Sequence, residues 1–178
     1  MKRITLIILL ISFSCCEKHQ EKKAVLKNKT VDFFDPIYLR ASGVDANFNI
    51  SASFSECGEW GGHQEDLKIF SKESNYKDYF LNYTKTSIDC DKRDSKGLNL
   101  QTIVVQKTIK LTESDKESII AYMKRMIESK VKERFPGHSG DSFSIINADS
   151  TLVIKVYDSN SNNLKSYNQL LSDLKLKE

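Results

Sequence analysis

Apolar and polar residues alternate strictly over residues 48–55, which predicts a strand with one buried and one solvent-facing side. The apolar positions are Phe48, Ile50, Ala52 and Phe54. Glycines at positions 58, 61 and 62 then interrupt the pattern and predict a turn. The alternation resumes over residues 65–71, with Leu67 and Ile69 on one side, so we expect a return strand there.

Two longer segments continue the predicted sheet. Tyr79, Leu81 and Tyr83 alternate with polar residues in a third strand that ends near Ile88. The segment 99–111 is rich in Ile, Val and Thr and predicts a long fourth strand, whose alternation shifts at Val104-Val105 as in a β-bulge. Because short polar connections join the four strands, we expect an antiparallel meander.

A helix is predicted next. Thr112 or Ser114 is expected to cap it, and Ser114 with Glu117 has the spacing of a capping box. The helix is expected to end at residues 135–137, where a proline and a glycine occur. Its apolar stripe, which we interpret as core, consists of Ile119, Met123, Met126, Ile127 and Val131.

The last part of the chain predicts two strands and a second helix. The strands are expected at residues 143–146 and 151–157, on either side of a tight turn. The helix is expected at 162–174, with an apolar side formed by Leu164, Tyr167, Leu170, Leu171 and Leu174. The order ββββ-α-ββ-α indicates an α+β fold, with one antiparallel sheet and two helices packed on one face.

Residues 1–16 have the pattern of an export signal. Lys2 and Arg3 precede an apolar run that extends from position 4 to position 13. About ten apolar residues are too few to cross a bilayer of roughly 30 Å as a helix, but they fit the hydrophobic region of a secretory signal. The charged segment 17–23 follows at once, which argues against a transmembrane anchor.

Ser12-Phe13-Ser14 leads directly into Cys15-Cys16, and this segment resembles the lipobox of bacterial lipoprotein precursors. The resemblance implies that a cysteine thiol is acylated and that the signal is cut just before it. We expect Cys15 to be the lipidated residue, with Cys16 as the alternative. An ordinary secretory signal, or a buried N-terminal strand, is the competing interpretation.

These features divide the chain into a signal peptide at 1–14, a lipidated N-terminus and flexible tether at 15–30, and one globular domain at 31–178. The whole chain has a formal net charge of +3, and cleavage removes Lys2 and Arg3 but no acid, which leaves +1. With Lys and Glu interspersed along the chain, this balance gives no indication of a nucleic-acid partner.

Cys57 and Cys90 are the cysteines outside the signal region. An exported domain meets an oxidising environment, in which pairs of cysteines tend to be bridged, so we expect a Cys57–Cys90 disulfide. One alternative is two buried thiols that act as small apolar groups. Another is a nucleophile pair, formed by Cys57 with His63 or by Cys90 with His138, which a disulfide would exclude.

The densest polar cluster lies in the glycine-rich turn, where Glu59, Trp60, His63 and Glu65 are candidate binding residues. His63 with Glu59 or Glu65 has the composition of an acid–base pair or a metal site, and Trp60 that of a binding platform. The same residues fit a structural hairpin, in which the glycines adopt positive φ and Trp60 covers the core, and we favour this interpretation.

Other chemical motifs are not indicated by the sequence. HExxH and CxxC spacings do not occur, and the chain has three histidines, so we expect no metal site and no cofactor. The loop at 136–142 has neither the P-loop nor the nucleophile-elbow spacing.

Three functional hypotheses follow. The first is a non-catalytic, lipid-anchored binding or accessory domain, monomeric, bound to the bacterial cell envelope (the outer membrane by preference), and facing the periplasm or the cell surface. The second is an envelope enzyme, such as a hydrolase, that uses the turn at 58–65. The third is an inhibitor or immunity-type protein that blocks a toxin or a lytic enzyme. We favour the first, with an envelope protein or glycan as partner.

Overall fold

The computed structural model describes residues 33–34, 47–58, 61–72, 75–134, 137, 139–158 and 161–177. These residues belong to one compact unit, Val31–Glu178. The predicted signal peptide, both candidate lipidation sites and the predicted tether lie outside the described residues.

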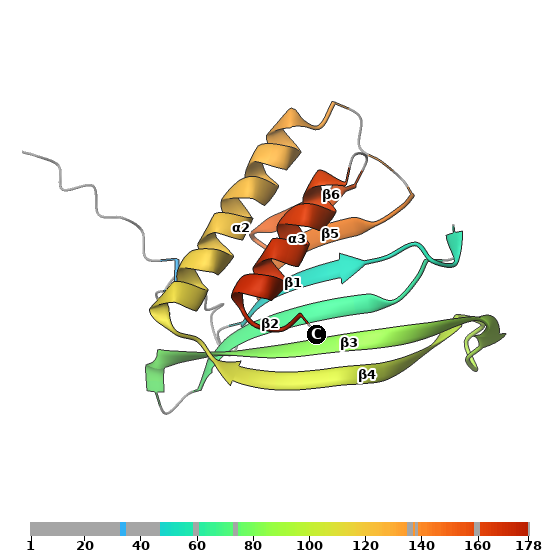
Figure 1. The fold of residues 1–178 in the computed structure, drawn as a ribbon, viewed down its shortest axis with the longest axis horizontal. Coiled ribbons are helices and arrows are strands. Elements are labelled where there is room, and N and C mark those ends of the chain that lie inside the picture. Colours follow the sequence, from blue (N-terminus) through green and yellow to red (C-terminus); the bar gives the residue numbers. More distant parts are fainter. Residues whose placement is uncertain are drawn as a thin grey trace, which may run out of the picture. The chain divides into compact units, whose positions relative to one another are not determined.

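The described part of the chain contains six strands and two helices in the order ββββ-α-ββ-α (Figure 1). The elements are β1 (Asn47–Ser53), β2 (Gln64–Lys72), β3 (Asn75–Arg93), β4 (Asn99–Lys110), α2 (Glu113–Lys132), β5 (Ser142–Asn147), β6 (Val153–Tyr157) and α3 (Asn162–Asp173). The strands form one antiparallel sheet in the spatial order β4-β3-β2-β1-β5-β6. The predicted α+β fold and its element order are therefore confirmed.

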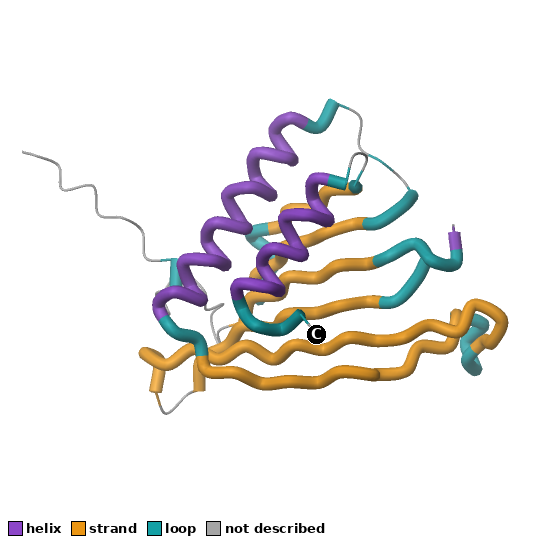
Figure 2. Tube along the Cα trace, in the orientation of Figure 1, coloured by secondary structure: helices purple, strands orange, loops and turns teal. Residues whose placement is uncertain are grey.

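The first four strands form the predicted meander, and β5 and β6 extend the sheet on the other side of β1. Both helices lie on the same face of the sheet (Figure 1). β3 pairs with β2 only as far as Lys85, opposite Glu65, and its remaining residues up to Arg93 pair with β4 alone. This end of the β3–β4 hairpin projects past β1 and β2, as the Cα tube in Figure 2 shows.

The core lies between the sheet and the two helices, and the alternating apolar positions supply its sheet side. Aromatic rings from three elements meet there, since Tyr167 of α3 packs against Tyr122 of α2 and Phe143 of β5, with ring centroids 6.2 and 5.5 Å apart. The other fully buried side chains include Phe48, Ile50, Leu67, Ile69, Leu81, Ile119, Met126, Ile145 and Leu170. Burial of this apolar surface is the main stabilising contribution to the fold.

The bulge predicted in the fourth strand is confirmed. Val105 lies opposite Lys85 and Ile103 lies opposite Thr86, so Val104 is the additional residue on β4.

The N-terminus of α2 differs from one of the two predictions. Thr112 is the N-cap, and the capping box joins it to Asp115, whereas the box predicted from Ser114 and Glu117 is wrong. Thr112 Oγ1 accepts a hydrogen bond from Asp115 N (3.2 Å), and Asp115 Oδ2 accepts one from Thr112 N (2.8 Å). The reason lies in the sheet: Leu111 N still donates to Tyr79 O, so Thr112 is the first residue that leaves the ladder.

The apolar stripe of α2 is shorter than predicted. Ile119, Met123 and Met126 are buried as expected, but Ile127 and Val131 are 45% and 81% exposed. α2 has 20 residues and α3 has 12, so the last turns of α2 extend beyond the helix that packs beside it (Figure 1).

Candidate functional site

The candidate site surrounds the carboxylate of Glu65, on the helix-facing side of the sheet. Side chains two residues apart on a strand share a face, so Glu65 of β2 points to the same side as the core residues Leu67 and Ile69. Glu65 is 3% exposed, and Lys85 lies directly opposite it on β3. An ion pair thus replaces the apolar contacts at this end of the core.

Three donor groups and one imidazole nitrogen surround the Glu65 carboxylate. Oε2 accepts hydrogen bonds from the hydroxyl groups of Tyr83 on β3 (2.9 Å) and Tyr167 on α3 (3.0 Å). Oε1 lies 3.1 Å from Lys85 Nζ and 3.4 Å from His63 Nε2. An ionised carboxylate offers about four acceptor positions, and the two hydroxyl groups and the Lys85 ammonium group occupy three of them.

This environment keeps Glu65 ionised. Burial raises the pKa of Glu65, but the hydrogen bonds from Lys85, Tyr83 and Tyr167 and the charge of Lys85 together lower it below its ordinary value. Burial, followed by the charge of Glu65, raises the pKa of Tyr167 well above its ordinary value. At neutral pH the cluster therefore holds a carboxylate anion and neutral tyrosine hydroxyl groups, and Glu65 positions its neighbours.

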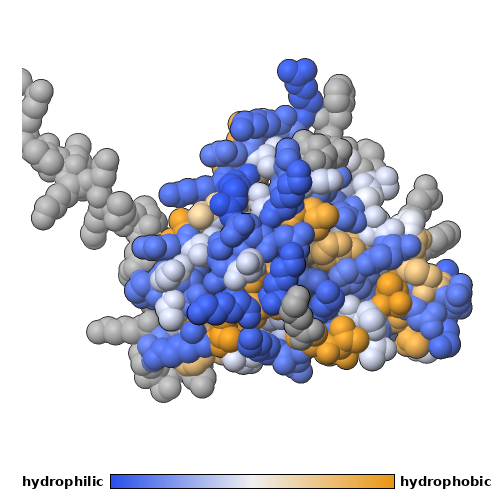
Figure 3. All heavy atoms as spheres, in the orientation of Figure 1, coloured by the Kyte–Doolittle hydropathy of each residue, from blue (hydrophilic) through white to orange (hydrophobic). Residues whose placement is uncertain are grey.

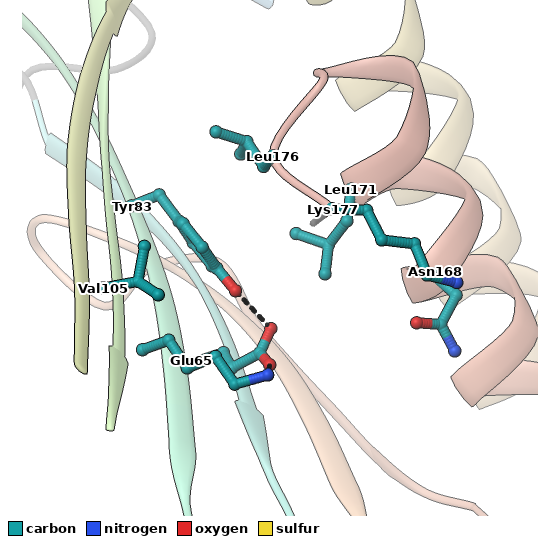
Figure 4. A pocket seen from close by; sticks show the side chains of 8 residues that line it. Glu65, Tyr83, Val105, Asn168, Leu171, Leu176 and Lys177 are labelled. Atoms are coloured by element: carbon teal, nitrogen blue, oxygen red, sulfur yellow. Dashed lines mark hydrogen bonds and ion pairs between the residues drawn. The ribbon is translucent and has the colours of Figure 1, made fainter. Parts of the chain in front are cut away.

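A cavity of about 180 Å³ opens beside this cluster. β2, β3 and β4 form one side, and α3 and the C-terminal segment form the opposite side (Figure 4). The lining residues are Glu65, Tyr83, Lys85, Val105, Asn168, Leu171, Leu176 and Lys177. The lining thus combines two lysines and an asparagine with apolar residues.

The segment after α3, residues 174–177, forms part of the cavity wall because it is bonded both to α3 and to β4. After α3, Lys175 adopts a left-handed backbone conformation (φ 54°), and Leu176 N donates to Leu171 O (2.8 Å), which turns the chain back over the helix end. Lys107 Nζ on β4 donates to Lys175 O (3.1 Å), which connects the segment to the sheet.

His63 belongs mainly to the turn between β1 and β2. Its ring stacks on Phe54 with centroids 4.1 Å apart, its Nδ1 faces a carboxylate oxygen of Glu56, and its main-chain N–H donates to Glu56 Oε2 (2.9 Å). Burial raises the pKa of Glu56, but the hydrogen bonds from His63 lower it below its ordinary value. These contacts are those of a residue that stabilises the turn.

The structure brings two of the four candidate binding residues together. His63 and Glu65 meet through Nε2 and Oε1, whereas Glu59 and Trp60 lie outside the described residues. The second carboxylate at His63 belongs to Glu56, which the sequence analysis did not select.

Three residues of the cluster, Tyr83, Lys85 and Tyr167, were not predicted as site residues. A signal for Lys85 was present: it continues the buried alternation of Tyr79, Leu81 and Tyr83. A lysine on the core-facing side is less costly beside an acidic partner, although the side chain of Lys85 remains 39% exposed. The sequence contains no comparable signal for Tyr167, whose hydroxyl is 102 positions away from Glu65.

Cys57 and Cys90 form a disulfide, with their Cα atoms 5.6 Å apart, which confirms the predicted bridge. It joins the β1–β2 turn to the projecting part of β3. Because the bridge uses both sulfur atoms, the alternative nucleophile pair of Cys57 and His63 is excluded in this structure. His138, the other predicted base, lies outside the described residues.

No protein-family model and no curated protein matches this chain. In the described part of the chain, no three His, Cys, Asp or Glu side chains are grouped so as to hold a metal ion. None of the described helices combines the length and apolar character required to cross a membrane.

Proposed function

We propose that the protein is an exported, lipid-anchored, non-catalytic binding domain of the bacterial cell envelope, and that its cavity takes the anionic end of a small ligand. The observation that carries the proposal is the position of Lys85. The ammonium group of Lys85 lies beside the cavity, where it pairs with Glu65 Oε1. Because an ammonium group has three donors, Lys85 can still donate to a ligand.

The rest of the lining supports the same ligand chemistry. Three donors already contact Glu65, and the other polar lining residues, Lys85, Lys177 and Asn168, can each donate to a ligand. Leu171 and Leu176 supply an apolar wall for a short hydrocarbon body. About 180 Å³ is less than the roughly 300–1,000 Å³ of pockets for drug-sized molecules, which favours a small ligand or a single chain end.

Binding is a better fit than acid–base catalysis for this cluster. A general acid or base needs a pKa near the working pH and an exchangeable proton. The pKa of Glu65 is instead lowered, and its oxygens already accept from Tyr83, Tyr167 and Lys85.

Export and anchoring are supported by the lipobox-like segment that ends at Cys15 and by the Cys57–Cys90 disulfide. Disulfides persist in oxidising compartments and are rare in the bacterial cytosol. One acyl chain gives only marginal membrane affinity, so the two or three chains of the lipoprotein pathway suit a stable anchor.

A titration with straight-chain carboxylates, from acetate to hexanoate, tests the cavity. The side-chain amide of Asn168 should shift in NMR spectra, and affinity should rise with chain length as the hydrocarbon covers Leu171. Lys85→Met and Lys177→Ala should each weaken binding about tenfold, because each removes a charge-assisted hydrogen bond. Melting curves of both variants check that they remain folded.

The matched control is Lys68→Met, since Lys68 is exposed on the opposite face of β2. This variant should bind the carboxylates as the unmodified protein does. Absence of a shift for every carboxylate, or equal binding by all three variants, would contradict the proposed ligand site.

The inhibitor or immunity-type hypothesis is the second candidate, and one observation favours it. The projecting end of the β3–β4 hairpin carries exposed apolar side chains, with Leu98 62% and Leu100 39% exposed. Such side chains suit insertion into a protein partner.

A further inference from the structure

β4 forms one edge of the sheet, and among the described strands β3 is its single neighbour. Leu111 N donates to Tyr79 O (2.9 Å), which shows that the main chain of Leu111 faces β3. In an antiparallel pair, hydrogen-bonded positions recur at every second residue. The main-chain groups of Ile109 and Lys107 therefore face β3 as well.

The main-chain groups of Gln106, Thr108 and Lys110 consequently face away from the sheet. The register with β3 is regular from Lys110 to Val105, and the bulge at Val104 ends it. Residues 105–110 thus present a straight row of outward N–H and C=O groups, which is a template for another strand.

Apolar side chains flank this row. Ile103 and Val104 are 59% and 54% exposed. In Figure 3, apolar atoms interrupt the hydrophilic surface along the lower edge and toward the right-hand end, where β4 and the hairpin lie in Figure 1. Exposed apolar surface of this kind is typical of sites at which proteins associate.

The charge of β4 indicates which partner fits. β4 contains Lys107 and Lys110 and no Asp or Glu. Lys110 forms an ion pair with Asp78 (2.8 Å), but Lys107 donates to the neutral carbonyl of Lys175 and keeps its charge uncompensated by this contact. An acidic strand complements this edge, whereas a second copy of the chain would bring the same lysines to it.

We propose that residues 105–110 of β4 bind an extended, acidic segment of a partner protein, which joins the sheet as an additional antiparallel or parallel strand. Main-chain hydrogen bonds supply affinity, and Lys107 selects an acidic side chain opposite it. The Cys57–Cys90 disulfide fastens the adjoining hairpin, which reduces the conformational freedom lost on binding. This surface is distinct from the carboxylate cavity, although Val105 borders both.

Fluorescence anisotropy with synthetic peptides of about eight residues tests the proposal. The probe alternates Thr or Val with Glu. One control peptide has Gln in place of Glu, and the other keeps Glu but carries N-methyl groups at every second residue, which block main-chain pairing. The acidic probe should bind, and both control peptides should bind at least tenfold more weakly.

Thr108→Pro tests the edge on the protein side. Proline removes the outward N–H and its ring obstructs an incoming strand, yet it is tolerated on edge strands where the N–H faces solvent. We expect a loss of at least tenfold in affinity for the acidic probe. Thr108→Ala is the matched control and should bind as the unmodified protein does, and Lys107→Glu should favour a Lys-containing probe over the acidic one.

The following outcomes decide whether the β4 edge binds an acidic strand of a partner protein. Absence of binding by the acidic probe at millimolar concentration, equal binding by the N-methylated peptide, or equal binding by Thr108→Pro and Thr108→Ala would overturn the proposal. A dimer in light scattering that Thr108→Pro dissociates would assign the edge to a second copy and overturn it too. Short carboxylates should bind to Thr108→Pro as they do to the unmodified protein. The experiments therefore distinguish a failure of the strand-binding proposal from a failure of the carboxylate-binding proposal.

Discussion

At the scale of single residues, Glu65 links the two layers of the molecule. It is a buried charge, and removing it from water is costly unless donors replace the lost solvent. Tyr83 supplies a donor from the sheet, and Tyr167 supplies one from α3. The carboxylate therefore connects the helix layer to the sheet beside the cavity.

Glu65→Gln should make stability less dependent on pH in the acid range. The folded pKa of Glu65 is below the ordinary value of about 4.3. Its stabilising contribution is thus complete above that ordinary value and is lost as the pH falls through the folded pKa. At pH 7 the variant should be less stable by about 1.5–3 kcal/mol, the range for hydrogen bonds to charged groups.

Urea unfolding at a series of pH values below 7 measures this effect. The free energy of unfolding should fall more steeply with acidification in the unmodified protein than in Glu65→Gln, and the two curves should approach each other at the acid end. Parallel curves would show that folding does not change the pKa of Glu65.

Gly62 and Gly61 provide a matched pair in the β1–β2 turn. A Cβ at Gly62 would overlap the carbonyl group of Phe54 and the carboxylate of Glu56, whereas at Gly61 the space is open and the strain comes from a φ of 84°. Gly62→Ala should therefore destabilise the fold by more than about 3 kcal/mol, and Gly61→Ala by about 1 kcal/mol. Thermal or urea unfolding of both variants gives the order, and the reverse order would refute this account of the turn.

Among the elements, the β3–β4 hairpin is distinctive because it projects beyond the strands that support it. Beyond Lys85, β3 pairs only with β4 within the described sheet. The Cys57–Cys90 disulfide attaches this part of β3 to the β1–β2 turn. The disulfide thus holds the end of the hairpin that lies next to the proposed docking edge.

Reduction of the disulfide should lower stability and loosen the hairpin. The bridge closes a loop of 33 residues, for which the chain-entropy model gives about 3–4 kcal/mol. The thermal midpoint should fall, and amide hydrogen exchange should increase most in residues 86–100. Mass spectrometry after alkylation of the native, unreduced protein should find no accessible thiol at Cys57 or Cys90, and two labelled thiols would contradict the bridge.

For the whole molecule, the proposed location rests on the N-terminal sequence. If the lipobox-like segment directs acylation, metabolic fatty-acid labelling should label the protein, and Cys15→Ser should abolish the label. Retention of label in Cys15→Ser with its loss in Cys16→Ser would assign the modification to the second cysteine. An unlabelled parent protein would refute the lipoprotein proposal.

Local patterns alone determined the element order and the fold class. Period-two alternation, as in Phe48, Ile50 and Ala52, reflects how each strand divides its side chains between core and solvent, so it can be read without knowing the partner strand. The irregular alternation at Val104 was sufficient to locate the bulge. The polar connections between β1, β2, β3 and β4 were short enough to indicate a meander.

Only the tertiary structure decided features that depend on distant residues. The sequence placed Glu65 where the glycine-rich turn meets the return strand. It is the centre of a buried cluster because β3 and α3 bring Tyr83, Lys85 and Tyr167 to it. The exposure of Val131 depends on where α3 begins beside the last turns of α2 (Figure 1). Such features follow from which surfaces meet when the layers pack, and a residue's own neighbours in the chain do not contain that information.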